Sequence, residues 1–76
     1  MKLPVLSRQE LIKVLVKEFG FETKRQTGSH VLLIKFVAGK KIDTVVPLHK
    51  ELAIGTLRGI LRQAKISPEE FLEKIK

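Results

Sequence analysis

The chain has 76 residues, and 15 Lys and Arg against eight Asp and Glu give it a formal net charge of +7 at pH 7. It has no cysteine, which excludes disulfide bonds and thiolate metal sites. No apolar stretch approaches the roughly 20 residues of a membrane span, and the N-terminal apolar stretch is too short for a signal peptide. We expect a single cytoplasmic domain over residues 1–76, whose positive charge favours nucleic acid, an anionic surface or an acidic protein as partner.

The chain opens with a helix predicted over residues 7–19. Ser7 provides the N-cap and Glu10 completes a capping box, while Gly20 provides the stop signal. Apolar residues recur at helical spacing and form one stripe, made of Leu11, Ile12, Leu15, Val16 and Phe19.

Residues 21–47 change to the pattern of strands and predict a three-stranded antiparallel meander. The strands are expected at residues 21–26, 29–37 and 41–46, with turns at 27–28 and 38–40. Pro47 marks the end of the third strand because it has no N–H to donate. Both faces of the second strand carry apolar residues, so the sequence does not decide which face packs against the helices. We expect helices to cover one face and a partner to cover the other.

Two helices follow the sheet. The first is predicted over residues 56–65, with Thr56 as its N-cap and an apolar stripe of helical period. A short helix then begins at Ser67, with Pro68 in its first position and Glu70 closing a second capping box. The order of helix, three strands, helix and short helix predicts an α+β fold with the helices packed on one face of the sheet.

The segment over residues 24–30 is the strongest candidate for chemistry. Lys24 and Arg25 attract a phosphodiester, and the Gly28 turn lets the backbone approach a phosphate closely. Ser29 supplies a hydroxyl. His30 supplies an imidazole, the side chain that most readily accepts and donates protons near neutral pH. RNA carries its own nucleophile, the 2′-hydroxyl, so a single base that removes this proton can start cleavage. On spacing alone, a surface or packing role for His30 stays open beside the catalytic one.

Other basic side chains are candidates for RNA binding. His49 is a candidate general acid or phosphate contact, with an exposed loop residue as the alternative. Arg58 and Arg62 fall on one stripe of the second helix, where they either grip phosphates or form a solvated face. Lys35, on the second strand, is a further candidate because the positive charge concentrates on the sheet and its loops.

Carboxylates and aromatic residues set limits on the mechanism. Glu22 and Asp43 are isolated in the sequence, so no acidic cluster is predicted to hold magnesium, and we expect phosphodiester chemistry without a metal or cofactor. The aromatic residues are four Phe, with no Tyr or Trp. Proteins that bind single-stranded RNA usually stack its bases on aromatic side chains. This composition therefore favours recognition of the RNA backbone and of RNA shape.

Three motifs resemble, in order, those of the HicA (YcfA-like) toxin family. They are Gly28-Ser29-His30, then Val46-Pro47-Leu48-His49, then the segment Gly-Thr-Leu-Arg-Gly-Ile-Leu-Arg-Gln-Ala over residues 55–64. The end of the opening helix, residues 18–22, is also similar, so the resemblance extends from Ser7 to Phe71. The chain departs from the family in its apolar run after His30, where many members have polar or aromatic residues, and in Gly59, where a better helix former is usual.

The resemblance implies a double-stranded-RNA-binding-domain-like α-β-β-β-α fold. It also implies a ribonuclease that cuts messenger RNA, with His30 as the catalytic histidine. An acidic HicB-type antitoxin would neutralise this toxin in a hetero-oligomer, and the free toxin would be a monomer. Two alternatives stay open, a non-catalytic RNA-binding module and a basic protein-interaction domain.

Overall fold

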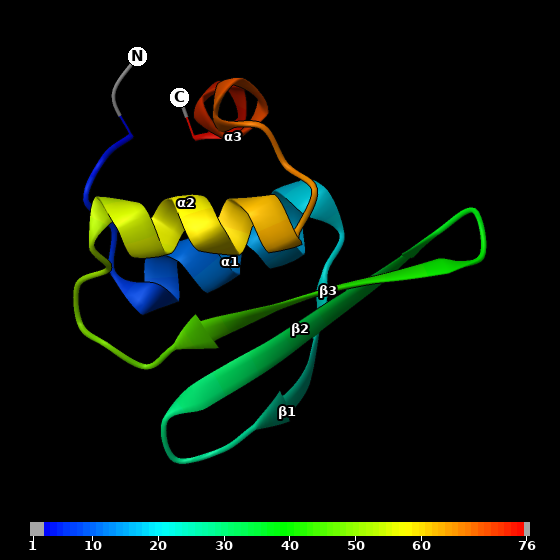
Figure 1. The fold of residues 1–76 in the computed structure, drawn as a ribbon, viewed down its shortest axis with the longest axis horizontal. Helices are drawn as coiled ribbons and strands as arrows, with labels where there is room; N and C mark the ends of the chain where they lie inside the picture. The colour runs from blue at the N-terminus through cyan, green and yellow to red at the C-terminus, as the bar shows by residue number, and fades with distance from the viewer. Residues whose placement is uncertain (1–2, 76) are drawn as a thin grey trace.

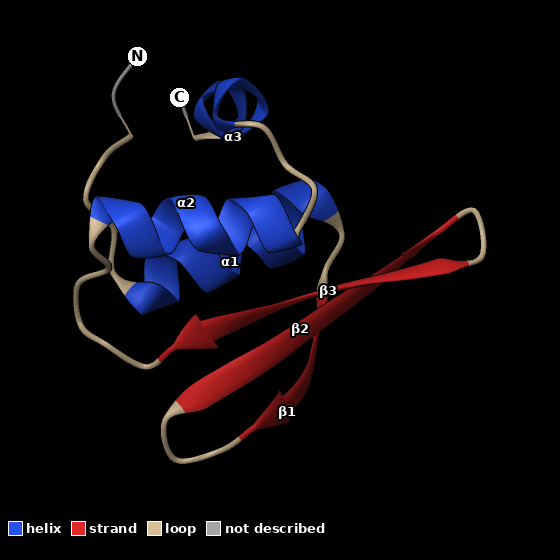
Figure 2. Cartoon of the chain, in the orientation of Figure 1, coloured by secondary structure: helices blue, strands red, loops and turns tan. Residues whose placement is uncertain are grey.

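The computed structural model describes residues 3–75, and its elements follow the predicted order (Figure 1). They are α1 (Arg8–Phe19), β1 (Glu22–Gln26), β2 (His30–Val37), β3 (Lys40–Pro47), α2 (Ile54–Gln63) and α3 (Pro68–Lys74). The strands form one antiparallel sheet in the order β1-β2-β3. All three helices lie to one side of this sheet (Figures 1 and 2), so the predicted α+β fold is confirmed.

Both predicted capping boxes are present. The Ser7 N–H donates to Glu10 Oε1 at 3.0 Å, and the Glu10 N–H donates to Ser7 Oγ at 3.1 Å. Ser67 and Glu70 repeat this arrangement at the start of α3. Hydrogen bonds from the backbone and then the side chain of Ser7 lower the pKa of Glu10. The ionised Glu10 therefore stabilises the folded chain above its unfolded pKa, and this contribution is lost as the pH falls through the lowered folded pKa.

The predicted start of α2 at Thr56 was wrong. The helix begins at Ile54, and its N-cap is Ala53, which makes no side-chain capping hydrogen bond. Long-range contacts set this boundary instead. Leu52, just before the helix, is buried and pairs as an isolated β-bridge with Leu6. This pairing fixes the direction in which the chain enters the helix.

Gly59 lies in the middle of α2 and is expected to weaken it. A Cβ built at this position meets no atom within 4 Å, so alanine fits without displacing a neighbour. We expect Gly59→Ala to stabilise the protein by about 1 kcal/mol, the difference in helix propensity, as measured by urea unfolding. Gly39→Ala is the matched control, because its φ of 79° disfavours a side chain. A Gly59→Ala protein no more stable than wild type contradicts the prediction.

The two faces of β2 have different surroundings. Val31 and Leu33 point toward the helices and are buried in the core, which settles the facing that the sequence left open. The alternate residues, among them His30, Leu32 and Phe36, lie on the face without helices. We call this second surface the open face. Several buried residues complete the core on the helix side, including Leu11, Leu15, Phe21, Val46, Leu57, Leu61 and Phe71.

A buried polar contact joins α2 to the edge strand β3. The hydroxyl of Thr44 donates to the Ile60 carbonyl and contacts Gln63 Oε1, both at 3.1 Å. Gln63 Oε1 also accepts from the Val45 N–H at 3.3 Å. These bonds satisfy the buried hydroxyl and fix the end of α2 against the strand that leads to His49.

Candidate active site

The turn between β1 and β2 holds His30 in place. The hydroxyl oxygen of Thr27 accepts the His30 N–H at 3.1 Å and the Ser29 N–H at 3.4 Å. The backbone N–H of Thr27 donates to the His30 carbonyl at 2.8 Å. Sequence reasoning assigned Thr27 only to a turn. Its position three residues before His30 was the available signal, since Thr hydroxyls bond to nearby backbone groups.

The side chain of Ser29 orients the imidazole. Ser29 Oγ lies 2.8 Å from His30 Nδ1, and both residues are exposed. When Nδ1 carries the proton, it donates to the Ser29 hydroxyl, and the lone pair of Nε2 is then free to accept a proton from a substrate. The turn therefore holds the imidazole on the molecular surface, and in this tautomer Nε2 is the nitrogen that can accept a proton.

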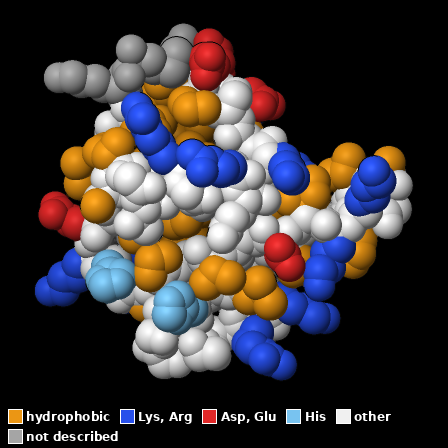
Figure 3. All heavy atoms as spheres, in the orientation of Figure 1, with side chains coloured by type: hydrophobic (Ala, Val, Ile, Leu, Met, Phe, Trp, Pro, Cys, Tyr) orange, Lys and Arg blue, Asp and Glu red, His pale blue; other side chains and the backbone are white. Residues whose placement is uncertain are grey.

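The chain after β3 brings the second histidine to the same place. His30 pairs with Pro47 across the β2–β3 ladder, and the Leu48 N–H donates to the Ser29 carbonyl at 2.9 Å. His49 follows directly and is exposed. Figure 3 shows the two histidine side chains near each other on one face of the molecule. The structure thus places two exposed imidazoles beside one turn.

Two of the predicted cations lie on the strand that enters this turn. Arg25 pairs with Leu32, two residues from His30, so it belongs to the open face with the imidazole. Lys24 occupies the β-bulge where the β1–β2 register shifts. Gly28 has open space where a Cβ would stand, so the backbone of the turn can be approached closely.

The structure does not bring the remaining candidates to the turn. Lys35 lies on the helix-covered face, where its Nζ donates to the Phe19 carbonyl at 2.9 Å and lies 5.2 Å from the centre of the Phe21 ring. Arg58 and Arg62 line a hollow between α2 and the start of α3. None of the residues of the histidine turn lines that hollow.

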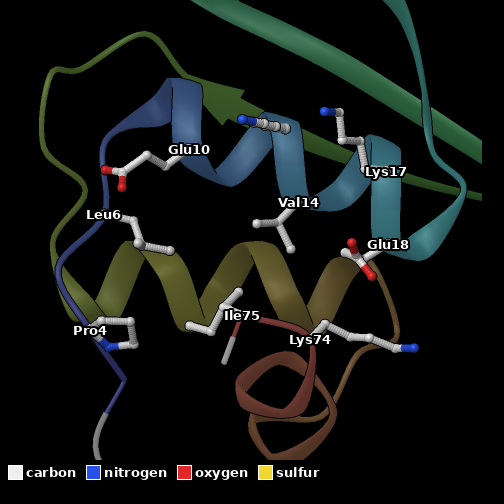
Figure 4. A pocket seen from close by; sticks show the side chains of 9 residues that line it. Pro4, Leu6, Glu10, Val14, Lys17, Glu18, Lys74 and Ile75 are labelled. Atoms are coloured by element: carbon white, nitrogen blue, oxygen red, sulfur yellow. The ribbon is translucent and has the colours of Figure 1, made fainter.

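A separate hollow of about 470 Å³ lies between α1, α3 and the segment before α1 (Figure 4). Leu6, Val14 and Ile75 supply apolar surface there, and Glu10 and Lys17 are among its charged residues. Neither histidine lines it. Within residues 3–75, no three His, Asp or Glu side chains gather as potential metal ligands, and no helix of that range has the length and apolarity to cross a membrane.

A protein-family model described as the HicA toxin of bacterial toxin–antitoxin systems matches residues 8–66. The chain belongs to the HicA toxin family. The match runs from α1 to beyond the end of α2 and so includes the turn and both histidines. No curated protein and no solved structure matches the chain. Membership of the HicA family implies an antitoxin partner, and HicA toxins are known for cleaving messenger RNA.

Proposed function

We propose that this HicA toxin is an endoribonuclease that uses His30 as a general base. The observation that carries the proposal is the contact of 2.8 Å between Ser29 Oγ and His30 Nδ1 in an exposed turn. This contact leaves Nε2 to remove the proton from a 2′-hydroxyl of bound messenger RNA. Family membership supports RNA as the substrate.

The chemistry needs only groups of the substrate and of this chain. The deprotonated 2′ oxygen attacks the adjacent phosphorus and forms the new P–O bond. The bond to the 5′ oxygen breaks, and that oxygen leaves with a proton from His49 or from water. The products are a cyclic phosphate and a 5′-hydroxyl end. Lys24 and Arg25 stabilise the negative charge that develops on the phosphate oxygens.

Neutralisation follows from the same surface. A HicB-type antitoxin with acidic groups would cover the histidine turn or block the path of the RNA. Opposite charges on the two proteins make such an association fast and sensitive to salt. The free toxin would then be a monomer, and the silent form a larger complex with the antitoxin.

The experiment is incubation of partner-free protein with messenger RNA, with and without a chelator of divalent metals. We expect cleavage in both samples and fragments that end in a cyclic phosphate. Intact RNA that is retained in a salt-dependent way would identify a non-catalytic binding module. No RNA affinity at moderate salt would identify a protein-interaction domain, and cleavage lost with the chelator would overturn the metal-independent mechanism.

A further inference from the structure

The tip of the β2–β3 hairpin projects beyond the helices and beyond β1 (Figure 1). β1 pairs with β2 only as far as Ile34, whereas β2 and β3 stay paired to Val37 and Lys40. Phe36 lies on this projecting part, and 65% of its surface is exposed. The other three Phe are buried or partly buried, so within residues 3–75 Phe36 is the one phenylalanine that is exposed.

One ammonium group accompanies the exposed ring. Lys41 pairs directly with Phe36 across the ladder, so both side chains project from the same face. Lys40 is also exposed, but it pairs with Val37 and so projects from the other face. Lys41 lies 4.0 Å from Asp43, but both side chains are more than half exposed, and such a pair is weak and easily exchanged for another anion. An exposed aromatic ring with a neighbouring cation is the combination that binds single-stranded nucleic acid.

Phe36 and His30 lie on the same face of the same strand. They are six residues apart, an even number, so both belong to the open face. At about 3.3 Å per residue they are separated by roughly 20 Å. Leu32 lies between them, with Arg25 paired beside it. One nucleotide cannot reach both ends, whereas a strand of several nucleotides can.

We propose that Phe36, with Lys41 beside it, stacks on a base of single-stranded RNA several nucleotides from the bond that His30 cleaves. The proposal rests on the proposed ribonuclease function and names the form of its substrate. It departs from the expectation, drawn from the few aromatic residues, that the chain recognises the backbone and shape of RNA and does not stack bases. Duplex RNA keeps its bases stacked inside the helix, so it gains nothing from this ring.

The test measures binding of a single-stranded 2′-O-methyl oligoadenylate, whose blocked 2′ oxygen prevents cleavage. We expect Phe36→Ala to weaken binding by about tenfold or more, the usual effect of losing one stacked base, and Phe36→Trp to retain it. Val37→Ala is the matched control, because Val37 is adjacent and 46% exposed but lies on the other face. Lys41→Ala should lower the slope of log affinity against log salt by about 0.7, the value for one phosphate contact on a single strand.

Three results would overturn the proposal: unchanged binding in Phe36→Ala, equal losses in Phe36→Ala and Val37→Ala, or an equal loss toward a 2′-O-methyl duplex. The first is also the result expected if the hairpin tip docks a protein instead of RNA. The readout is independent of catalysis, so the two proposals can fail separately. A wild-type protein that binds the oligonucleotide through Phe36 but leaves ordinary RNA intact refutes the ribonuclease function alone.

Discussion

Replacing His30 by glutamine is expected to slow RNA cleavage by roughly 10²–10⁴-fold, the usual contribution of a positioned general base. Glutamine keeps a polar side chain at this exposed site but cannot remove the proton of a 2′-hydroxyl. His30 is exposed, and its backbone is held by Thr27, so the fold and RNA binding should persist. The measurement is the single-turnover rate of cleavage, with urea unfolding and oligonucleotide affinity measured on the same samples.

A surface substitution away from the turn provides the control for this variant. Val16 is exposed on α1, and Val16→Ala should cleave RNA as wild type does. In cells, expression of the wild-type chain alone should arrest growth, and His30→Gln should relieve the arrest. Wild-type cleavage rates in His30→Gln would remove this histidine from the mechanism.

Features that depend on neighbouring residues were predictable from the sequence. Each capping box joins residues three apart, so Ser7 with Glu10 and Ser67 with Glu70 were visible as local patterns. The strand order and the end of β3 at Pro47 followed from turn residues and from the missing N–H of proline. These elements position the turn that precedes His30, and the Gly28-Ser29-His30 motif itself is visible in the sequence.

Features that depend on distant residues were not predictable in the same way. The start of α2 follows the pairing of Leu52 with Leu6, which no local pattern encodes. Lys35 carries a charge like any candidate RNA contact, but its partner is the carbonyl of Phe19, 16 residues earlier. The facing of β2 required the helices to be in place, because apolar residues occupy both of its faces.

The proximity of the two histidines depends on distant residues but was partly predictable from the sequence. A hairpin that turns at Ala38 and Gly39 places His30 opposite Pro47, and this register follows from counting outward from the turn. Sequence reasoning named His49 as a candidate but did not count the register. The structure therefore adds the proximity of the two histidines. This proximity suggests separate roles to test, His30 as general base and His49 as general acid.

Replacing His49 by glutamine is expected to slow cleavage of ordinary RNA by about 10²-fold or more if His49 protonates the leaving 5′ oxygen. The decisive measurement uses a nucleoside 3′-(p-nitrophenyl phosphate), whose leaving group departs without a proton. His49→Gln should cleave this substrate at close to the wild-type rate. His30→Gln should be slow on both substrates, because the 2′-hydroxyl must lose its proton in either case.

This pair of substrates separates a general acid from a phosphate contact. If His49 only binds the phosphate, its loss slows both substrates alike, since both carry the same anionic group. If water protonates the leaving oxygen, His49→Gln cleaves ordinary RNA at the wild-type rate. Lys50→Gln is the matched control, because Lys50 is the exposed neighbour of His49 in the same loop and its substitution leaves both histidines in place. A defect in His49→Gln that disappears with the activated leaving group, and that Lys50→Gln lacks, assigns the acid to His49.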